Sequence, residues 1–265
     1  MFSVQSLLYH FSTPVLGFLI VAIYISLSIT GLCVVRKLFS SHTFKLHNDI
    51  ADPLFTTLGT IYAVMLAFTL VVTWQSFDAS SKNTAREANY LADLYRDSTP
   101  LPAAFKGELK TDLKKYVSAI ITDEWAIMSS GNGRSPKVQE EQQKLWNLYA
   151  GFQPRNETQK IFFTESVKKF NEACEMRRQR LFDASTGLNG ILYFMLIAGG
   201  LVTISFTLFF GTENFGPQLL MTSLLATLIG LTLFTIISLD YPFTGDISIK
   251  PDVFKTELST LLNNK

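Results

Sequence analysis

Four long stretches of this chain carry no charged residue. They cover residues 14–35, 53–77, 184–212 and 214–239, and each is rich in Leu, Ile, Val and Phe. A helix needs about 20 apolar residues to cross the hydrocarbon core of a bilayer, so each stretch is long enough to span a membrane. Thirty-two of the 45 charged residues lie between the second and third stretch, within residues 78–183. The order is therefore two spans, a water-facing block and two more spans.

This order predicts an all-α integral membrane protein with four transmembrane helices in a 2+2 arrangement. A helical cytoplasmic domain would be inserted between spans 2 and 3 and would continue directly from span 2. The expected segments are an N-terminal hairpin at 1–77 (spans 14–35 and 53–77), the inserted domain at 78–187, a C-terminal hairpin at 188–240 (spans 188–210 and 217–239) and a cytoplasmic tail at 241–265.

Composition argues against several classes of protein. The formal net charge is +1, so no basic field suggests a nucleic-acid partner. Cys33 lies in the first span and Cys174 in the charged block, which makes a structural disulfide improbable. The three histidines do not form a cluster with metal-ligand spacing, and no nucleotide-binding loop or nucleophile motif is present. We therefore expect no cofactor, no metal site and no enzymatic activity.

The distribution of basic residues indicates the orientation. More Lys and Arg flank the side that holds both termini and the central block than flank the other side, although Arg36 and Lys37 oppose this bias. Because basic loops stay inside, the sequence predicts a multi-pass protein of the inner (plasma) membrane with both termini and the central domain in the cytoplasm. The first apolar run exceeds the apolar part of a signal peptide, so we expect it to remain as a span.

The charged block is typical of helices. Residues 60–99 contain no Gly or Pro, which predicts one continuous helix from span 2 into the block, ended by Pro100 and Pro102. Apolar residues at i, i+3 and i+4 predict a second helix over about 103–128. A Ser- and Gly-rich loop follows, then a short helix over about 138–149. Another helix is expected within 155–186, which is also free of Gly and Pro.

A polar stripe runs along the second span. At 100° per residue, hydroxyl, aromatic and aliphatic side chains share one face of this helix from mid-membrane into the charged block. The predicted pore-lining residues are Tyr62, Leu66, Thr69, Thr73, Ser76, Phe77 and Ser80. In this interpretation Tyr62, Leu66 and Phe77 form constrictions, while Thr69 and Thr73 offer oxygens to ions. The alternative is that the stripe packs against neighbouring helices, and the stripe alone does not decide between them.

Three carboxylates are candidate pore-mouth residues: Asp49 and Asp52 before span 2, and Glu87 at the far end of the stripe. A ring of such groups around an oligomer attracts cations. Asp52 followed by Pro53 also fits a helix N-cap. For Glu87, as for Asp123 and Glu124, a solvated salt bridge is the alternative.

Two further features have simple structural interpretations. Adjacent glycines, Gly199 and Gly200, predict a close helix approach in span 3. Asp240 closes span 4, where we expect it to end the helix rather than to bind an ion.

Several motifs resemble those of the bestrophin-like family of membrane proteins. They are the run from Thr84 to Arg96, then Leu101-Pro102, Tyr116, Glu124-Trp125, and the ending Leu239-Asp-Tyr-Pro-Phe-Thr-Gly245. The likeness extends from span 2 onward. Tyr241 stands where the family pattern leads us to expect Arg.

The chain is also similar in layout to the bestrophin ion channels. In those proteins four spans flank a helical cytoplasmic insert, five subunits assemble, and the second span lines a hydrophobic pore neck. The resemblance implies a homo-oligomeric ion channel in a lipid bilayer, with the pentamer as the expected assembly. Its ligands would be inorganic ions, with a slight lean towards cations from the acidic outer residues. The alternative function is a membrane scaffold or sensor whose helical domain binds a cytoplasmic protein.

Overall fold

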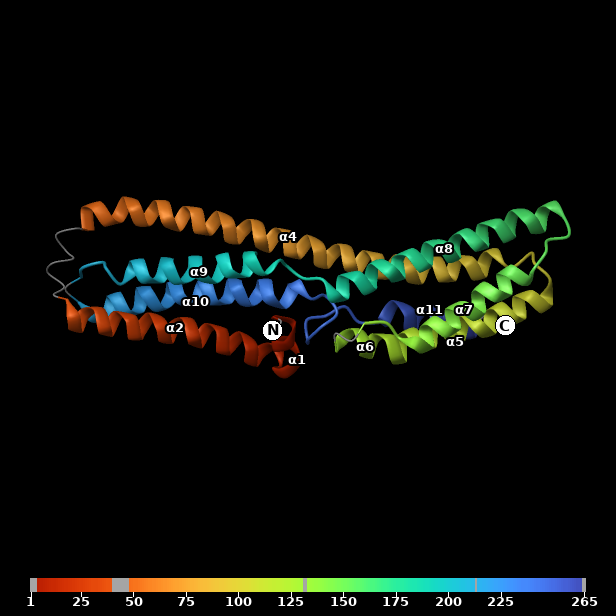
Figure 1. Cartoon of the computed structure of the whole chain (residues 1–265), viewed down its shortest axis with the longest axis horizontal. Helices are drawn as coiled ribbons and strands as arrows, with labels where there is room; N and C mark the ends of the chain where they lie inside the picture. Colours follow the sequence, from red (N-terminus) through yellow and green to blue (C-terminus); the bar gives the residue numbers. More distant parts are fainter. Residues whose placement is uncertain (1–3, 40–47, 131–132, 213, 264–265) are drawn as a thin grey trace. The chain divides into compact units, whose positions relative to one another are not determined.

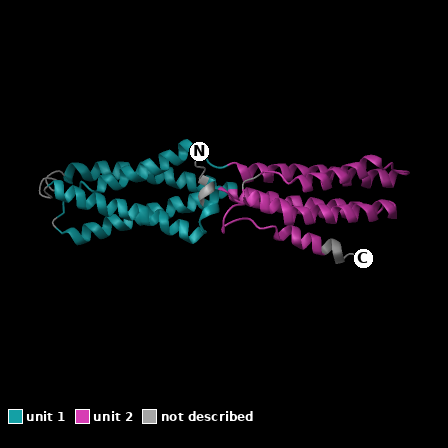
Figure 2. Ribbon diagram, turned by 60° about the horizontal axis from the view of Figure 1, so that its bottom comes forward, with its two compact units in different colours: residues 1–76, 187–240 teal, residues 77–186, 241–265 magenta. Residues whose placement is uncertain are grey.

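The computed structural model describes residues 4–39, 48–130, 133–212 and 214–263, and every regular element in these ranges is helical (Figure 1). Two compact units are formed. The first unit combines residues 1–76 with 187–240, and the second combines 77–186 with 241–265 (Figure 2). Each unit therefore joins segments that are far apart in the sequence. Residues 40–47, in the middle of the predicted loop between spans 1 and 2, lie outside the described ranges.

The first unit contains the apolar helices. Its elements are α1 (Val4–His10), α2 (Thr13–Leu38), the first part of α4 (Asn48–Asp97), α9 (Gly190–Thr207) and α10 (Phe215–Asp240). Helices α2, α4, α9 and α10 are long and apolar enough to cross a membrane. They coincide with the four charge-free stretches, because each stretch contains about the 20 apolar residues that a span needs.

Glycines allow the helices of the first unit to approach closely. A Cβ atom on Gly230 of α10 would lie 3.0 Å from the Cα of Val21 on α2. On the same two helices, a Cβ on Gly17 would lie 3.1 Å from the ring of Phe234. Small residues at helix contacts are the usual means by which apolar helices pack in a membrane.

Helix α10 ends at Asp240, as predicted. The two oxygens of its carboxylate each accept a hydrogen bond from the backbone N–H of Leu188 at 2.9 Å. The hydroxyl of Tyr193 donates to the same carboxylate at 2.6 Å. Asp240 thus anchors the segment that enters α9.

The second unit is a bundle of mostly polar helices. Its elements are the rest of α4, α5 (Ala103–Ala119), a π-helical turn η1 (Ile120–Glu124), α6 (Trp125–Ser129), α7 (Pro136–Gly151), α8 (Glu157–Ser185) and α11 (Asp252–Asn263). The continuous helix predicted across residue 77 is confirmed, because α4 runs unbroken for 50 residues. The helix predicted over 103–128 is also present, but the π turn interrupts it.

Side-chain caps fix where the later helices begin. The hydroxyl of Ser135 accepts a hydrogen bond from the backbone N–H of Val138, directly before the Pro that opens α7. The side-chain oxygen of Asn156 accepts from the N–H of Gln159 at 2.8 Å and caps α8. Both are the arrangements that N-cap residues favour.

The core of the second unit is built on the predicted apolar stripe of α5. This stripe is buried, and its members are Phe105, Leu109, Leu113, Tyr116 and Val117. The segment that follows α10 joins the same core through Phe243 and Phe254. Residues 241–265 therefore fold into this unit, and their helix α11 was not predicted from the sequence.

Candidate functional site

The predicted pore-lining stripe on α4 is partly buried within its own chain. Tyr62, Thr73 and Ser80 are buried, Leu66, Thr69 and Phe77 are half-buried, and Ser76 is exposed. Burial within one chain does not test which residues line a pore, so the pore-lining assignment stays a prediction.

The contacts of Tyr62 account for its burial. Its hydroxyl donates to the backbone carbonyl of Leu196 on α9 at 3.0 Å. A Cβ on Gly199 would lie 2.7 Å from its ring, and one on Gly200 would lie 2.8 Å from its hydroxyl. These two glycines leave room for side chains of neighbouring helices, and the side chain of Tyr62 approaches both most closely.

The stripe hydroxyls are used inside the protein. Thr69 and Thr73 donate to backbone carbonyls four residues earlier, at 2.9 and 2.8 Å. Ser80 donates to the carboxylate of Asp183 on α8 at 2.7 Å. The bonds of Thr69 and Thr73 stay within α4, so only the bonds of Tyr62 and Ser80 to other helices favour the packing alternative.

The opposite face of α4 is left uncovered by its own chain. Its central residues Ile61, Val64, Phe68 and Val71 expose 67, 49, 69 and 51% of their surface. The exposed polar residues of this face lie on either side of that apolar centre: Thr57 and Thr60 before it, and Gln75 after it. At 100° per residue, all seven fall within about 50° of one line.

The far end of the stripe leads to a buried ionic cluster in the second unit. Glu87 and Arg180 form two hydrogen bonds, from Nε to Oε2 at 2.7 Å and from Nη2 to Oε1 at 2.9 Å. Arg180 also donates to Glu124 at 2.9 Å. Arg177 binds the same Glu124 through Nε, at 3.0 and 3.2 Å, and through Nη2 at 2.5 Å. We call these four residues the buried ionic cluster.

The helices α4, α8 and the π turn supply this cluster. Glu124 is the last residue of the π turn, and such turns are often found at functional sites. Aromatic rings cover Arg180: its guanidinium carbon lies 4.9 Å from the ring centroid of Trp125 and 5.7 Å from that of Phe254. Trp125 itself donates its indole N–H to the carbonyl of Ile249 at 3.1 Å.

Burial and ion pairing shift the pKa values of these groups in opposite directions. Burial alone would raise the pKa of Glu124, but the hydrogen bonds from Arg177 and the charges of Arg177 and Arg180 outweigh it and lower that pKa. Burial would lower the pKa of Arg180, yet the nearby charges of Glu87 and Glu124 raise it. For Glu87 burial prevails over the pull of Arg180, and its pKa is raised. Both arginines remain charged.

The solvated salt bridge expected at Glu87 and Glu124 is wrong. Both carboxylates are fully buried, because Arg177 and Arg180 replace their water. The same expectation is correct for Asp123, which binds Lys137 at 2.9 Å on the surface. Sequence reasoning missed Arg177 and Arg180. Their one signal was a spacing of three residues on a long helix, which places both side chains on one face.

The predicted mouth residues have different positions. Asp49 and Asp52 are exposed, whereas Glu87 is buried. The N-cap role of Asp52 is wrong, because α4 has already begun at Asn48 and Asp52 lies inside it. The side chain of Asn48 instead exchanges two hydrogen bonds with the backbone of Gly211, at 2.9 and 3.1 Å, and holds the start of the helix.

A family model described as Bestrophin-like domain matches residues 22–254. The chain belongs to the bestrophin-like family. A comparison with curated proteins finds no match.

The bestrophin-like fold is also seen in solved structures. Crystal structures of a bacterial bestrophin homolog from Klebsiella pneumoniae are similar to this chain. One has a TM-score of 0.64 at 14% identity, covering 93% of this chain and 97% of the other. Two point variants of that homolog have TM-scores of 0.66 and 0.67 at 14 and 12% identity, covering 93 and 92% of this chain and 99 and 98% of theirs. At such identities the likeness concerns the fold alone.

The bestrophin-like motifs converge on the buried ionic cluster. Glu87 comes from the first motif, Glu124-Trp125 from a later one, and Phe243 from the ending. Phe243 packs against Trp125 with ring centroids 5.9 Å apart. Motif residues from two distant parts of the sequence therefore contact Arg180, and Phe243 from a third packs on the Trp125 ring that covers it. Tyr241, where Arg was expected, is buried.

Proposed function

We propose that this chain forms a homo-oligomeric ion channel in the inner membrane, with α4 as the helix that lines the pore. Membership of the bestrophin-like family and four helices able to cross a membrane support this function. The resemblance to bestrophins favours a pentamer with unit 2 and both termini in the cytoplasm. The proposal includes no enzymatic activity and no cofactor.

The observation that carries the proposal is the uncovered face of α4. A helix that contributes to a shared pore must keep one face free of contacts within its own protomer. The face centred on Val64 and Phe68 is free, whereas the face of Tyr62 and Thr73 is occupied. We therefore propose that the Val64 face points to the pore axis, and that the stripe originally predicted to line it packs within the protomer.

The chemistry of this face fits a pore neck. Its centre is apolar over about three helical turns, and polar residues lie at both ends. Rings of apolar side chains restrict water and ions by dewetting, so this segment would be the barrier to conduction. The exposed Asp49 and Asp52 would concentrate cations at the mouth.

Cysteine accessibility tests which face lines the pore. Purified full-length protein with Cys33→Ala is reconstituted into bilayers, and currents are recorded before and after a membrane-impermeant thiol reagent. We expect the reagent to change the current of Val64→Cys and Phe68→Cys but not that of Thr69→Cys and Thr73→Cys. The opposite pattern would restore the predicted stripe as the lining, with the channel function intact.

Other outcomes address the function itself. Absence of current from an intact oligomer would contradict the channel and favour the scaffold or sensor. A monomer in detergent would contradict a shared pore, and a reversal potential that follows the Cl⁻ gradient would contradict the lean towards cations. A reporter fused after Lys265 should be cytoplasmic.

A further inference from the structure

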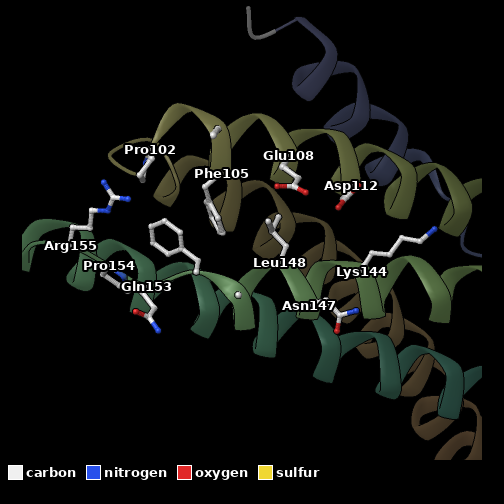
Figure 3. Close-up of a pocket in the computed structure, with 13 residues that line it drawn as sticks. Pro102, Phe105, Glu108, Asp112, Lys144, Asn147, Leu148, Gln153, Pro154 and Arg155 are labelled. Carbon is white, nitrogen blue, oxygen red and sulfur yellow. The ribbon is translucent and has the colours of Figure 1, made fainter.

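The second unit carries an open hollow between α5 and α7 (Figure 3). Its volume is about 1010 Å³. The apolar part of its lining is Phe105, Leu148 and Phe152, and the loop of residues 152–155 closes one end. This hollow is lined by no residue of the buried ionic cluster, and neither the family match nor the proposed pore gives it a role.

The rim of the hollow is divided by charge. Glu108 and Asp112 on α5 form an acidic side, and Lys144 on α7 and Arg155 in the loop lie across from them (Figure 3). Lys144 is already bound to Glu140 at 2.8 Å and to a second acid on α7. Glu108 and Arg155 have no ion-pair partner within the described part of the chain. One charge of each sign is therefore available to a partner.

An apolar projection lies at the same end of this unit. Ile161 and Phe162, in the first turns of α8, expose 65 and 38% of their surface. Glu157 and Lys160 flank them and are themselves exposed, with 3.8 Å between their charged groups. We call Ile161 and Phe162 the α8 knob. A hydrogen bond joins the first turn of α8 to the preceding loop, since the side chain of Gln159 accepts from the backbone N–H of Arg155 at 2.9 Å.

We propose that the α8 knob of one subunit docks into the α5/α7 hollow of the next subunit around the ring. This inference rests on the proposed homo-oligomer and identifies a contact that builds it. A ring with rotational symmetry needs two different complementary surfaces on each subunit. Surfaces that meet in such a ring must also lie at the same level along its axis.

Knob and hollow satisfy both conditions. The knob is exposed and the hollow is open, and both are apolar at the centre. Helix α8 begins at Glu157, two residues after Arg155, and the four helical steps from there to Ile161 rise only about 6 Å, so the two surfaces lie at a similar level. The charges also complement each other: Lys160 would approach Glu108, and Glu157 would approach Arg155 of the neighbour. Such pairs fix the register of an interface.

Cross-linking between introduced cysteines tests the contact in the full chain. Cys33→Ala and Cys174→Ala remove the native thiols, and the pair Asn147→Cys/Ile161→Cys places one thiol on the rim of the hollow and one on the knob. We expect a short bis-maleimide to produce a ladder of covalent multimers up to the full subunit number. Each single variant should remain monomeric on a denaturing gel.

A matched control uses Lys168→Cys in place of Ile161→Cys. Position 168 lies on the same face of α8 two turns further on, so the same reagent should give several-fold less ladder. A second pair, Glu108→Cys/Lys160→Cys, repeats the test at the rim in case Ile161→Cys disturbs folding.

The outcomes separate the two proposals. Products that stop at dimers, or a ladder equally strong with Lys168→Cys, would overturn the docking. An oligomer of unchanged mass with no ladder from either pair would overturn the docking alone. A monomeric unmodified chain would overturn both the docking and the proposed channel.

Discussion

Arg180 provides the sharpest test of the structural reasoning. It is fully buried and donates two hydrogen bonds to Glu87 and one to Glu124. In the described residues Arg180 is the one ion-pair partner of Glu87. Glu124 differs, because it keeps Arg177 when Arg180 is removed. Arg180→Met retains most of the side-chain volume but leaves the carboxyl group of Glu87 buried without its partner.

The expected cost follows from that asymmetry. Removing one partner of a buried ion pair destabilises a protein by about 3–5 kcal/mol. For a protein of roughly this size, 1 kcal/mol changes the melting temperature by about 2–4 °C, so we expect Arg180→Met to lower it by roughly 6–20 °C. Replacing both members of such a pair by apolar residues is often close to neutral. The double variant Glu87→Met/Arg180→Met should therefore melt well above the single variant.

Thermal unfolding of the full chain in detergent, followed by tryptophan fluorescence, measures these changes. Trp125 is a suitable reporter because its ring lies against Arg180. Arg178→Met is the matched control: this exposed neighbour pairs with Glu175 on the same helix, and its loss should cost no more than about 1 kcal/mol. A double variant as unstable as Arg180→Met would refute the argument that the orphaned carboxyl group causes the loss.

Three further predictions concern packing, pH and the C-terminal segment. Gly199→Ala should cost about 1–3 kcal/mol in the same melting assay, since its Cβ would meet the ring of Tyr62, and adding Tyr62→Ala should relieve that clash. The pKa of Glu124 is lowered, so the stability it contributes is complete above its ordinary value of 4.5 and is lost as the pH falls through its folded pKa. Unfolding measured from pH 6 to about pH 3 should therefore show a shallower acid limb in Glu124→Gln. Trp125→Phe keeps an aromatic ring but removes the hydrogen bond to Ile249, at a cost of about 1 kcal/mol. Limited digestion with trypsin should then cut the C-terminal segment faster. An unchanged digestion rate would show that this hydrogen bond does not hold the segment in place.

Several elements of the fold could be read from the sequence because their signals are local. Charge-free stretches of more than 20 residues predict spans, and the absence of Gly and Pro across residue 77 predicted the continuous α4. The i, i+3/i+4 pattern of α5 identified its buried face. Each of these signals depends on the composition of a single helix.

Other features could not be predicted, because they depend on partners distant in sequence. Glu87 and Arg180 are 93 positions apart, and an acid on a helix rich in cations looks solvated until its partners are known. Helix α11 is short, and its Phe254 is buried only because Trp125 and Arg180 are beside it.

The order of spans, the helical nature of the charged block and the continuity of α4 all follow from local patterns of residues. These patterns also locate a polar stripe on α4, but a stripe shows only which side chains share a face. What that face touches depends on the fold: Tyr62 reaches the glycines of α9, and the stripe ends in the buried ionic cluster. Helical periodicity is a local property, whereas burial is set by whichever segment packs against the helix.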